Sequence, residues 1–516
     1  MKQRAQEARF NFSGGVNYSA SQDTLATNEL LLCRNARVSA DGSVERRTGI
    51  NKLHSSAFTA GGSPSNDSVL GITQWVPATG DTQLVAIAGA KLWYSNDDGV
   101  NWTSVTPGAG NLSTTVMADF QPMVLSGQPR LFIASGSDLF TWDGTAITKR
   151  DLVNSIPNCS IIRLFGNRLF CNSTDDPGFL FWSKLGDGTN MAVGGKSDGG
   201  NVALNADSDE PLIALEVLGS SLLIATRNGI SRFTGTADDI RVLTDTEGVA
   251  SSIGPVYNEV SGFIKAHPGS FRRCGQVVMM WTDRGPYIVT EAGVVPIGDK
   301  IDTEGLGALE TMWRDQTIPA YVVYHRTRKE IWFIFRSAAD SVASSAFIFS
   351  ERRQCWSGPF QFPVGVTSVC EADIAGVPTI LAGCDDGFVR LLDDISKGRD
   401  DGATDYTHTI RLPPFIFADA GPHNTKSLRS VFLQVEREDA LTLPIVKVYP
   451  DNGSAETATL VANTSIVGAP TNLRYDVNSQ GKRFVVEISG AFASGTSGDD
   501  MKVIGVIVDG SVMERW

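Results

Sequence analysis

The chain has few histidines and cysteines for its length. Its 516 residues include five histidines and seven cysteines. The histidines show no H-x-x-x-H or H-E-x-x-H spacing, so no zinc site is indicated. The cysteines are odd in number, widely spread and without a C-x-x-C motif, which favours reduced, mostly buried thiols over a disulfide framework. We therefore expect synthesis in a reducing compartment.

Long apolar runs are absent as well. No stretch of about 18 uncharged apolar residues occurs, which is the length needed to cross a bilayer as a helix. The first seven residues, MKQRAQE, lack the apolar core of a secretory signal. We expect neither a signal peptide nor a membrane span.

An excess of positive charge is also missing. The formal net charge is −13 and the isoelectric point is near 5.0, so the surface as a whole repels polyanions and sequence-independent DNA wrapping is excluded. Basic residues occur as isolated pairs without interleaved aromatics, and we expect them to form surface salt bridges. The pairs are Arg46–Arg47, Arg272–Arg273 and Arg352–Arg353.

Glycine and proline, with 52 and 22 residues, stay below the share of roughly 25–30% that signals disorder. Hydrophobic residues make up 42% of the chain, enough to build large cores. The length corresponds to roughly three average domains, although all-β propellers and barrels often run longer as one unit.

A repeated pair of strands dominates residues 69–394. Each unit begins with a short apolar run, turns at Gly, Asn or Asp, and continues with an aromatic-rich strand, as in residues 83–88 with 91–94 and 130–134 with 138–142. Units start near residues 69, 113, 160, 212, 277, 320 and 366, a period close to the roughly 40–50 residues of propeller blades. We predict an all-β, β-propeller-like body of six or seven blades; a multi-sheet sandwich would give similar strand statistics.

The two ends of the chain differ from this middle part. Residues 395–516 contain segments that alternate apolar and polar positions, such as 430–436 and 483–488, and finish with the apolar strand 502–509. This pattern predicts a C-terminal β-sandwich. Residues 1–68 are mostly polar and hold no blade of their own. We predict three parts: an extended N-terminal arm (1–68), the β-propeller-like domain (69–394) and the sandwich (395–516).

Residues 95–102, SNDDGVNW, match the S-x-D-x-G-x-x-W pattern of the Asp box found in sialidases and other propellers. The pattern encodes a hairpin turn in which Ser and Asp side chains bond the backbone, Gly takes a positive φ and Trp packs on the blade. It supports a propeller and carries no catalytic information. The counterpart of the early sialidase Arg-Ile-Pro strand, residues 411–413, lies after the blades.

Other short motifs fail on context. Residues 195–199 satisfy G-x-S-x-G, but Gly/Ser/Asp-rich flanks replace the strand and helix of a nucleophile elbow, so a loop is expected. A phosphate-binding loop would need Gly where Asn190 stands. Asn205, Asp207 and Asp209 begin like a calcium loop, but Glu210 replaces its turn glycine. We predict no catalytic, cofactor-binding or metal-ligating residues, and no cofactor.

The N-terminal fifty residues carry a more specific pattern. Residues 9–17, RFNFSGGVN, are followed by residues 33–36, CRNA, and by residues 41–49, DGSVERRTG. This series resembles the opening of tail tubular protein B, the tail nozzle family of short-tailed bacteriophages, and the positions that match are Gly14, Gly15, Asn35, Gly42, Arg47 and Gly49. The chain departs from that family by its shorter length and by Thr48 in place of the usual Pro.

The resemblance implies a phage virion structural protein and not an enzyme. It implies a homo-oligomer, a hexameric ring stacked below the head-tail adaptor in the tail or neck, made in the host bacterial cytoplasm and passing double-stranded DNA without sequence-specific binding. The N-terminal arm would either reach a neighbouring copy or add an edge strand to its own propeller. A sialidase-like glycan hydrolase and a host-glycan-binding adhesin are the alternatives.

Overall fold

The computed structural model describes residues 4–59, 67–150, 155–194, 197–204, 210–227, 229–235, 241–242, 251–257, 264, 267–301, 319–336, 344–394, 400–401, 406–417, 423–437, 443–451, 453–463, 471–490 and 501–512. These residues form an all-β structure whose one short helix is the 3₁₀ turn η2, Pro268–Ser270. Within them, no helix has the length and apolar character required to cross a membrane.

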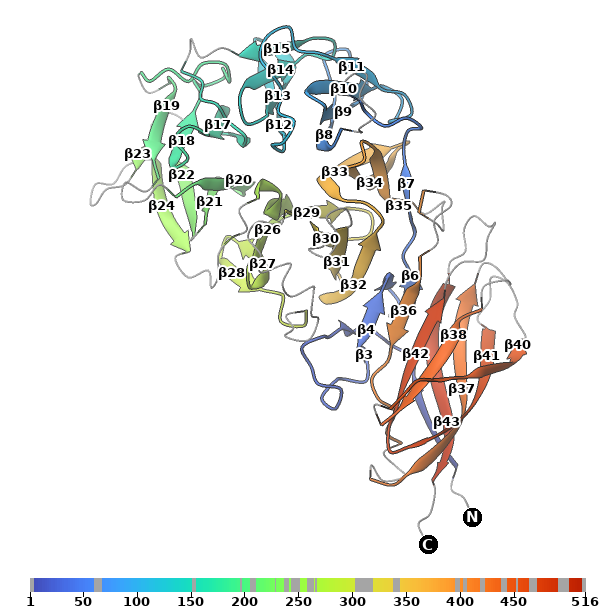
Figure 1. The fold of residues 1–516 in the computed structure, drawn as a ribbon. Helices are drawn as coiled ribbons and strands as arrows, with labels where there is room; N and C mark the ends of the chain where they lie inside the picture. Colours follow the sequence, from blue (N-terminus) through green and yellow to red (C-terminus); the bar gives the residue numbers. More distant parts are fainter. Residues whose placement is uncertain are drawn as a thin grey trace.

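A β-propeller occupies the middle of the chain, as the strand pattern predicted (Figure 1). Each blade begins with a strand beside the propeller axis, and the last of these strands, β33, packs against the first, β8, which closes the ring. The inner strands are β8 (Val69–Trp75), β12 (Asp119–Leu125), β16 (Ile162–Phe165), β20 (Leu212–Leu218), β25 (Phe271–Cys274), β29 (Ala320–His325) and β33 (Val366–Ile374).

Within the described residues, six blades are separate sheets, and their strands pair antiparallel except for the parallel pair β23–β24. Outside β8 lie β9 (Gln83–Ala88), β10 (Lys91–Ser95) and β11 (Thr103–Val105); outside β12 lie β13 (Gln128–Ala134), β14 (Leu139–Trp142) and β15 (Ile147–Arg150). Outside β16 lie β17 (Arg168–Asn172), β18 (Phe179–Trp182) and β19 (Gly200–Ala203); outside β20 lie β21 (Ser221–Thr226), β22 (Ile230–Gly235), β24 (Ser251–Tyr257) and β23 (Arg241–Val242). Outside β25 lie β26 (Val277–Thr282), β27 (Gly285–Thr290) and β28 (Gly293–Pro296); outside β33 lie β34 (Val377–Cys384), β35 (Val389–Asp394) and β7 (Gly49–Lys52).

The strands β29 to β32 lie in the ring between β25 and β33 but do not end there. After β30 (Glu330–Arg336), β31 (Ser344–Ser350) and β32 (Cys355–Phe362), the sheet continues through β4 (Leu32–Arg34) into β36 (His408–Arg411), β42 (Phe484–Gly490), β38 (Ile445–Pro450) and β39 (Glu456–Thr457). One nine-stranded sheet therefore belongs to both the propeller and the C-terminal domain.

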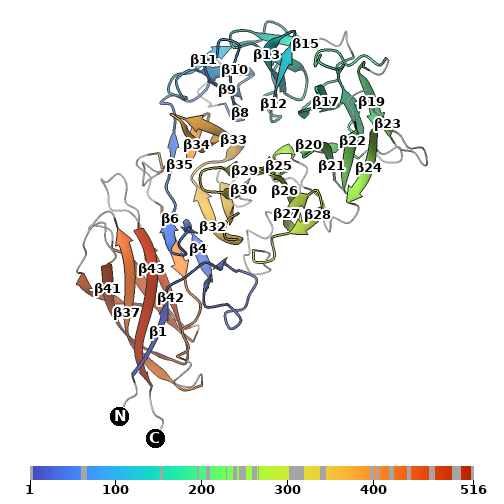
Figure 2. The same cartoon turned by 180° about the vertical axis from the view of Figure 1, so that it is seen from behind.

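The C-terminal sandwich closes over this shared sheet with a second one (Figure 2). The second sheet runs in the order β40 (Thr459–Asn463), β41 (Thr471–Gly481), β37 (Lys426–Arg437), β43 (Met501–Val512), β6 (Val44–Arg46) and β5 (Ala36–Val38), and β1 (Arg4–Arg9) also pairs with β43. A short parallel pair, β2 (Gly15–Val16) and β3 (Glu29–Leu30), lies in the N-terminal segment. Both ends of the chain thus contribute strands to the sandwich.

The blades are held together by side chains between their faces. Middle strands such as β9 are buried at every position, because both faces of a blade are covered by its neighbours and the strand has no solvent side. The cluster between the first two blades includes Val85, Ile87, Leu131 and Trp142. Equivalent clusters lie between the following blades.

The blade formed by β33, β34 and β35 takes its outer strand from the N-terminal segment. Strand β7 pairs antiparallel with β35, with Lys52 opposite Arg390 and Gly49 opposite Asp394. The buried Ile50 enters the hydrophobic cluster shared with the preceding blade. The segment before residue 69 therefore completes the propeller as well as the sandwich.

Replacing Ile50 with alanine tests this closure. Ile50 is 0% exposed, and deleting a buried isoleucine side chain costs about 2–5 kcal/mol through lost burial and the cavity left behind. We expect a loss of unfolding free energy in that range by urea titration of the full chain. Val461→Ala, at a strand residue that is 55% exposed, is the control and should change stability by less than about 0.5 kcal/mol. An Ile50 variant as stable as this control would contradict the role of β7.

Candidate functional site

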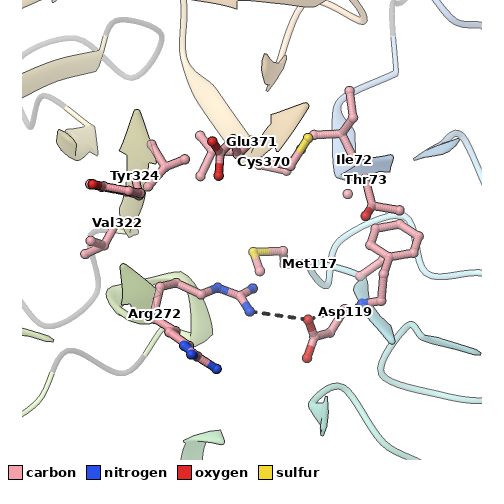
Figure 3. A pocket seen from close by; sticks show the side chains of 16 residues that line it. Ile72, Thr73, Met117, Asp119, Arg272, Val322, Tyr324, Cys370 and Glu371 are labelled. Atoms are coloured by element: carbon pink, nitrogen blue, oxygen red, sulfur yellow. Dashed lines mark hydrogen bonds and ion pairs between the residues drawn. The ribbon is translucent and has the colours of Figure 1, made fainter. Parts of the chain in front are cut away.

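The propeller axis contains a cavity of about 220 Å³. It is lined from five inner strands, β8, β12, β25, β29 and β33, and Figure 3 shows the polar side chains that face it. Those side chains are Thr73, Asp119, Arg272, Tyr324 and Glu371. Such a pocket, with a few convergent polar groups, is the first place to look for a binding site.

The charged groups on one side of the axis form a closed cluster. Arg163 donates to the Asp119 carboxylate at 2.6 Å and to the Glu216 carboxylate at 2.9 Å. Arg272 approaches both carboxylates at 3.5 Å. The four residues come from β12, β16, β20 and β25, so each of four successive blades supplies one charge. This geometry ties the blades together around the axis.

The environment of Glu216 fits that structural role. Burial raises its pKa, the Asp119 charge acts in the same direction, and the Arg163 guanidinium opposes both; the net result is a raised pKa. The two arginines already face two carboxylates, so the cluster balances its own charge. Before Arg163 or Arg272 could bind a substrate carboxylate, as the arginines of a sialidase do, each would have to lose its present carboxylate partners.

The other side of the cavity is also internally paired. The Tyr324 hydroxyl donates to Glu351 at 2.7 Å, and Arg326 pairs with Glu371 at 3.0 Å. Burial, with a further contribution from Glu371, raises the pKa of the Cys370 thiol to about 12. A protonated thiol is a poor nucleophile, so the raised pKa gives no support to Cys370 as a nucleophile.

The Asp-box residues form the expected turn between β10 and β11. The Ser95 hydroxyl donates to Asp97 at 2.7 Å and accepts the Gly99 amide at 3.0 Å. Gly99 has φ +87°, and the Trp102 indole donates to its carbonyl at 2.8 Å. The Asn101 amide, the largest effect, and the Ser95 hydroxyl lower the pKa of Asp97. The polar side chains of the motif serve the turn, and its structural interpretation is confirmed.

The remaining motifs supply no site. Residues 195–196 of the G-x-S-x-G stretch and the residues Asn205, Asp207 and Asp209 lie outside the described residues. In the described part of the chain, no group of three or more His, Cys, Asp or Glu side chains is placed to hold a metal ion. All seven cysteines are free thiols, six of them buried, and Cys159 and Cys171 pack in one hydrophobic cluster. Arg411 pairs with Glu487 inside the sandwich.

Two of the residues that resemble the nozzle family, Asn35 and Arg47, lie together where the propeller meets the sandwich. The Asn35 carboxamide accepts the Gln361 amide at 2.8 Å and donates to the Thr407 carbonyl at 2.9 Å. Arg47 forms a bidentate pair with Asp400 at 2.8 and 2.7 Å. The two side chains are also bonded to each other, from Arg47 Nε to Asn35 Oδ1 at 3.2 Å. They join the end of β32, the chain after the last blade and the start of β36.

Two of the matching glycines are required by their backbone. Gly15 has φ +68°, and a Cβ there would lie 2.5 Å from the Trp356 carbonyl oxygen. Gly42 has φ +88°, and a Cβ there would lie 2.5 Å from Asn11 Oδ1. Side chains are disfavoured at such positive φ values, and at Gly15 the atom in the way belongs to the backbone. Gly49 begins β7.

A buried ion cluster lies beside this junction. Asp393, at the end of β35, contacts Arg37 of β5 at 2.5 Å, Arg328 at 2.5 Å and His325 at 3.2 Å. Arg37 also contacts Glu330 of β30 at 3.1 Å. Burial alone would raise the pKa of Asp393, but Arg37, the His325 hydrogen bond and Arg328 reverse this effect and hold it well below its usual range.

The sequence prediction that the basic pairs form surface salt bridges is wrong for the pair Arg46–Arg47. Both side chains are buried, at 3% and 1% exposure, because Arg47 is paired with Asp400 and packs 3.6 Å from the Tyr406 ring centroid. A polar dipeptide gives no signal of burial when its partners lie hundreds of residues away. In the sequence, only the resemblance to the nozzle family singled out Arg47.

Removing Arg37 tests how much the junction cluster contributes. Arg37→Ala leaves the buried Asp393 and Glu330 carboxylates without their shared partner, which should lower the unfolding free energy by about 3–5 kcal/mol. Urea denaturation of the full chain measures it. Arg474→Ala is the control, since that side chain is 48% exposed and pairs with the exposed Asp476; its loss should stay below about 1 kcal/mol. Equal losses in the two variants would refute a special role for Arg37.

The depressed pKa of Asp393 predicts a pH dependence. A carboxyl whose pKa is lower in the folded state stabilises the fold fully above its unfolded pKa, and this contribution is lost as the pH falls from about 5 towards 1. The stability gap between the natural chain and Asp393→Asn should therefore be constant from pH 7 to about 5 and narrow on further acidification. Denaturant titrations at several pH values measure the gap. If the stability difference between the two chains instead widens below pH 4, the pKa of Asp393 is not lowered by folding.

Comparison with known proteins does not assign a family. No family model and no curated protein matches the chain. It is similar to solved chains from an S. cerevisiae Dbp5 variant bound to Nup159, a Gle1 variant, IP6 and ADP (9% identity, 67% of this chain and 95% of that chain, TM-score 0.35) and from K. lactis Hsv2 (8%, 67% and 93%, 0.32). It is also similar to the extracellular domain of a hybrid two-component system from B. thetaiotaomicron (12%, 71% and 38%, 0.32). These values support no inference about function.

Proposed function

We propose that this chain is a structural component of a tailed virus, part of a tail nozzle or neck ring through which the genome passes. The observation that carries the proposal is the position of the N-terminal residues that resemble the nozzle family. Asn35 and Arg47 are twelve residues apart in the sequence, yet their side chains are bonded to each other and to the segments that join the propeller to the sandwich. A motif that joins two domains is expected to recur in proteins that share the same domain arrangement.

The chain order supports the same proposal. Strands from both ends of the chain build the sandwich, and the propeller is inserted between them. A propeller that interrupts a β-rich body is also what the resemblance implies. The sialidase-like alternative has less support, because the Asp-box side chains are used in their own turn and Arg163 and Arg272 face carboxylates of the axial cluster.

The propeller axis itself is not a conduit for DNA. The axial cavity holds about 220 Å³, which cannot admit a duplex whose major groove alone is about 12 Å wide. A channel would have to form between copies of the chain, as in a ring. The net charge of −13 suits such a channel, because an acidic wall does not bind phosphates and lets DNA slide.

Quantitative mass spectrometry of density-purified virus particles from the source culture tests the proposal. The copies of this chain are counted against the major capsid protein. We expect about six copies per particle, the number for one cyclic ring. Absence from particles, with the chain free in the lysate, would overturn the proposal, and hydrolysis of a sialoside by the purified chain would then favour the enzyme.

A further inference from the structure

The propeller has acidic turns on one face and, in one blade, two basic turns on the other. Strands of a blade run antiparallel, so the turn between its second and third strands lies on one face, and its other two turns lie on the opposite face. On the first face these turns contain aspartates in several blades: Asp138, Asp175, Asp176, Asp283 and Asp386. On the opposite face, the turns after β29 and β31 contain Arg328, Lys329, Arg352 and Arg353.

Those basic turns line a groove of about 440 Å³, which we term the cationic groove. The N-terminal hairpin and the start of β43 complete it, and its charged lining is Asp41, Glu45, Arg328, Lys329, Glu330, Arg352, Arg353 and Lys502. Its three carboxylates are already paired: Asp41 with Lys502, Glu45 with Arg328, and Glu330 with Arg37.

Three cations of the groove are left over. Among the described residues, Lys329, Arg352 and Arg353 form no ion pair, although the Lys329 ammonium lies 5.8 Å from the Tyr324 ring centroid. Lys329 and Arg352 are exposed. Arg353 is partly covered, and its Nε is buried without a hydrogen-bond partner. Cations gathered in one groove repel one another, and an anionic partner that enters the groove relieves this repulsion.

The acidic turn between β17 and β18 is complementary to this groove in charge. Asp175 and Asp176 are exposed, and neither forms an ion pair within the described chain. The hydroxyl of the buried Ser173 accepts both of their backbone amides, at 3.2 and 2.9 Å, so the turn is held in one shape before binding.

We propose that the cationic groove of one copy receives the Asp175–Asp176 turn of the next copy. The two surfaces lie on opposite faces and in different blades, so they cannot meet within one molecule. The contact is therefore heterologous, the kind of contact that builds rings or filaments. This inference rests on the proposed function, because a ring requires that copies of the chain bind one another. It names the side chains that would form that contact.

A charge exchange tests the contact in the full-length chain. Self-association is measured by sedimentation equilibrium at low salt, with folding checked by thermal unfolding. Arg352→Glu and Asp176→Lys should each weaken association at least about tenfold, and the double variant should recover most of it because the opposite charges again face each other. Added salt should weaken association of the natural chain.

Arg273→Glu is the matched control, because Arg273 is exposed near the end of β25, next to the β25–β26 turn on the same face, and lies outside the groove. It should leave association unchanged. Each of three outcomes would overturn the proposal. The natural chain could stay monomeric at about 100 μM in low salt, or the double variant could associate as weakly as the single variants. Arg352→Glu could also change nothing except binding of the chain to a 30-bp DNA duplex. Particle counting tests the proposed function separately, since a chain absent from particles could still show the charge exchange.

Discussion

The buried carboxylate of Asp393 is the contact on which the arrangement of the two domains depends. It ends the last blade, accepts Arg37 from the N-terminal hairpin, and is flanked by Arg328 and His325 from the neighbouring blade. Taking these charges out of water is costly, and the cost is offset only because every charge has a close partner. The cluster therefore fixes one relative position of the hairpin and the two blades, and the shared sheet extends that position into the sandwich.

Much of the fold could be predicted from sequence because blade strands are local. Each pair of strands is separated by a short turn, and residues such as Val85 and Leu131 mark buried strands by their apolar runs. The shared sheet could not be predicted in this way. Strand β4 joins β32 and β36 across more than 300 residues of sequence, with Cys33 opposite both Gly358 and Ile410. Nothing in a short window of sequence specifies such a pairing.

The functional proposal depends on the same long-range contacts. Asn35 and Arg47 looked like isolated matches to a family pattern, and their partners Gln361, Thr407 and Asp400 carry no motif. The axial cluster was equally hidden, because its four charges come from four different blades. In this molecule buried charge pairs hold large parts together.

The outer strand of the last blade has a consequence for synthesis of the chain. Strand β7 is synthesised long before its partner strand β35, and the hydrogen bond from the Val389 amide to His54 spans 335 residues. Until then the growing propeller has an open edge, and the N-terminal segment has no sheet to join. Contacts between residues so far apart in the sequence form slowly. Until they form, the folded blades make an incomplete ring whose strand edges are exposed to other chains.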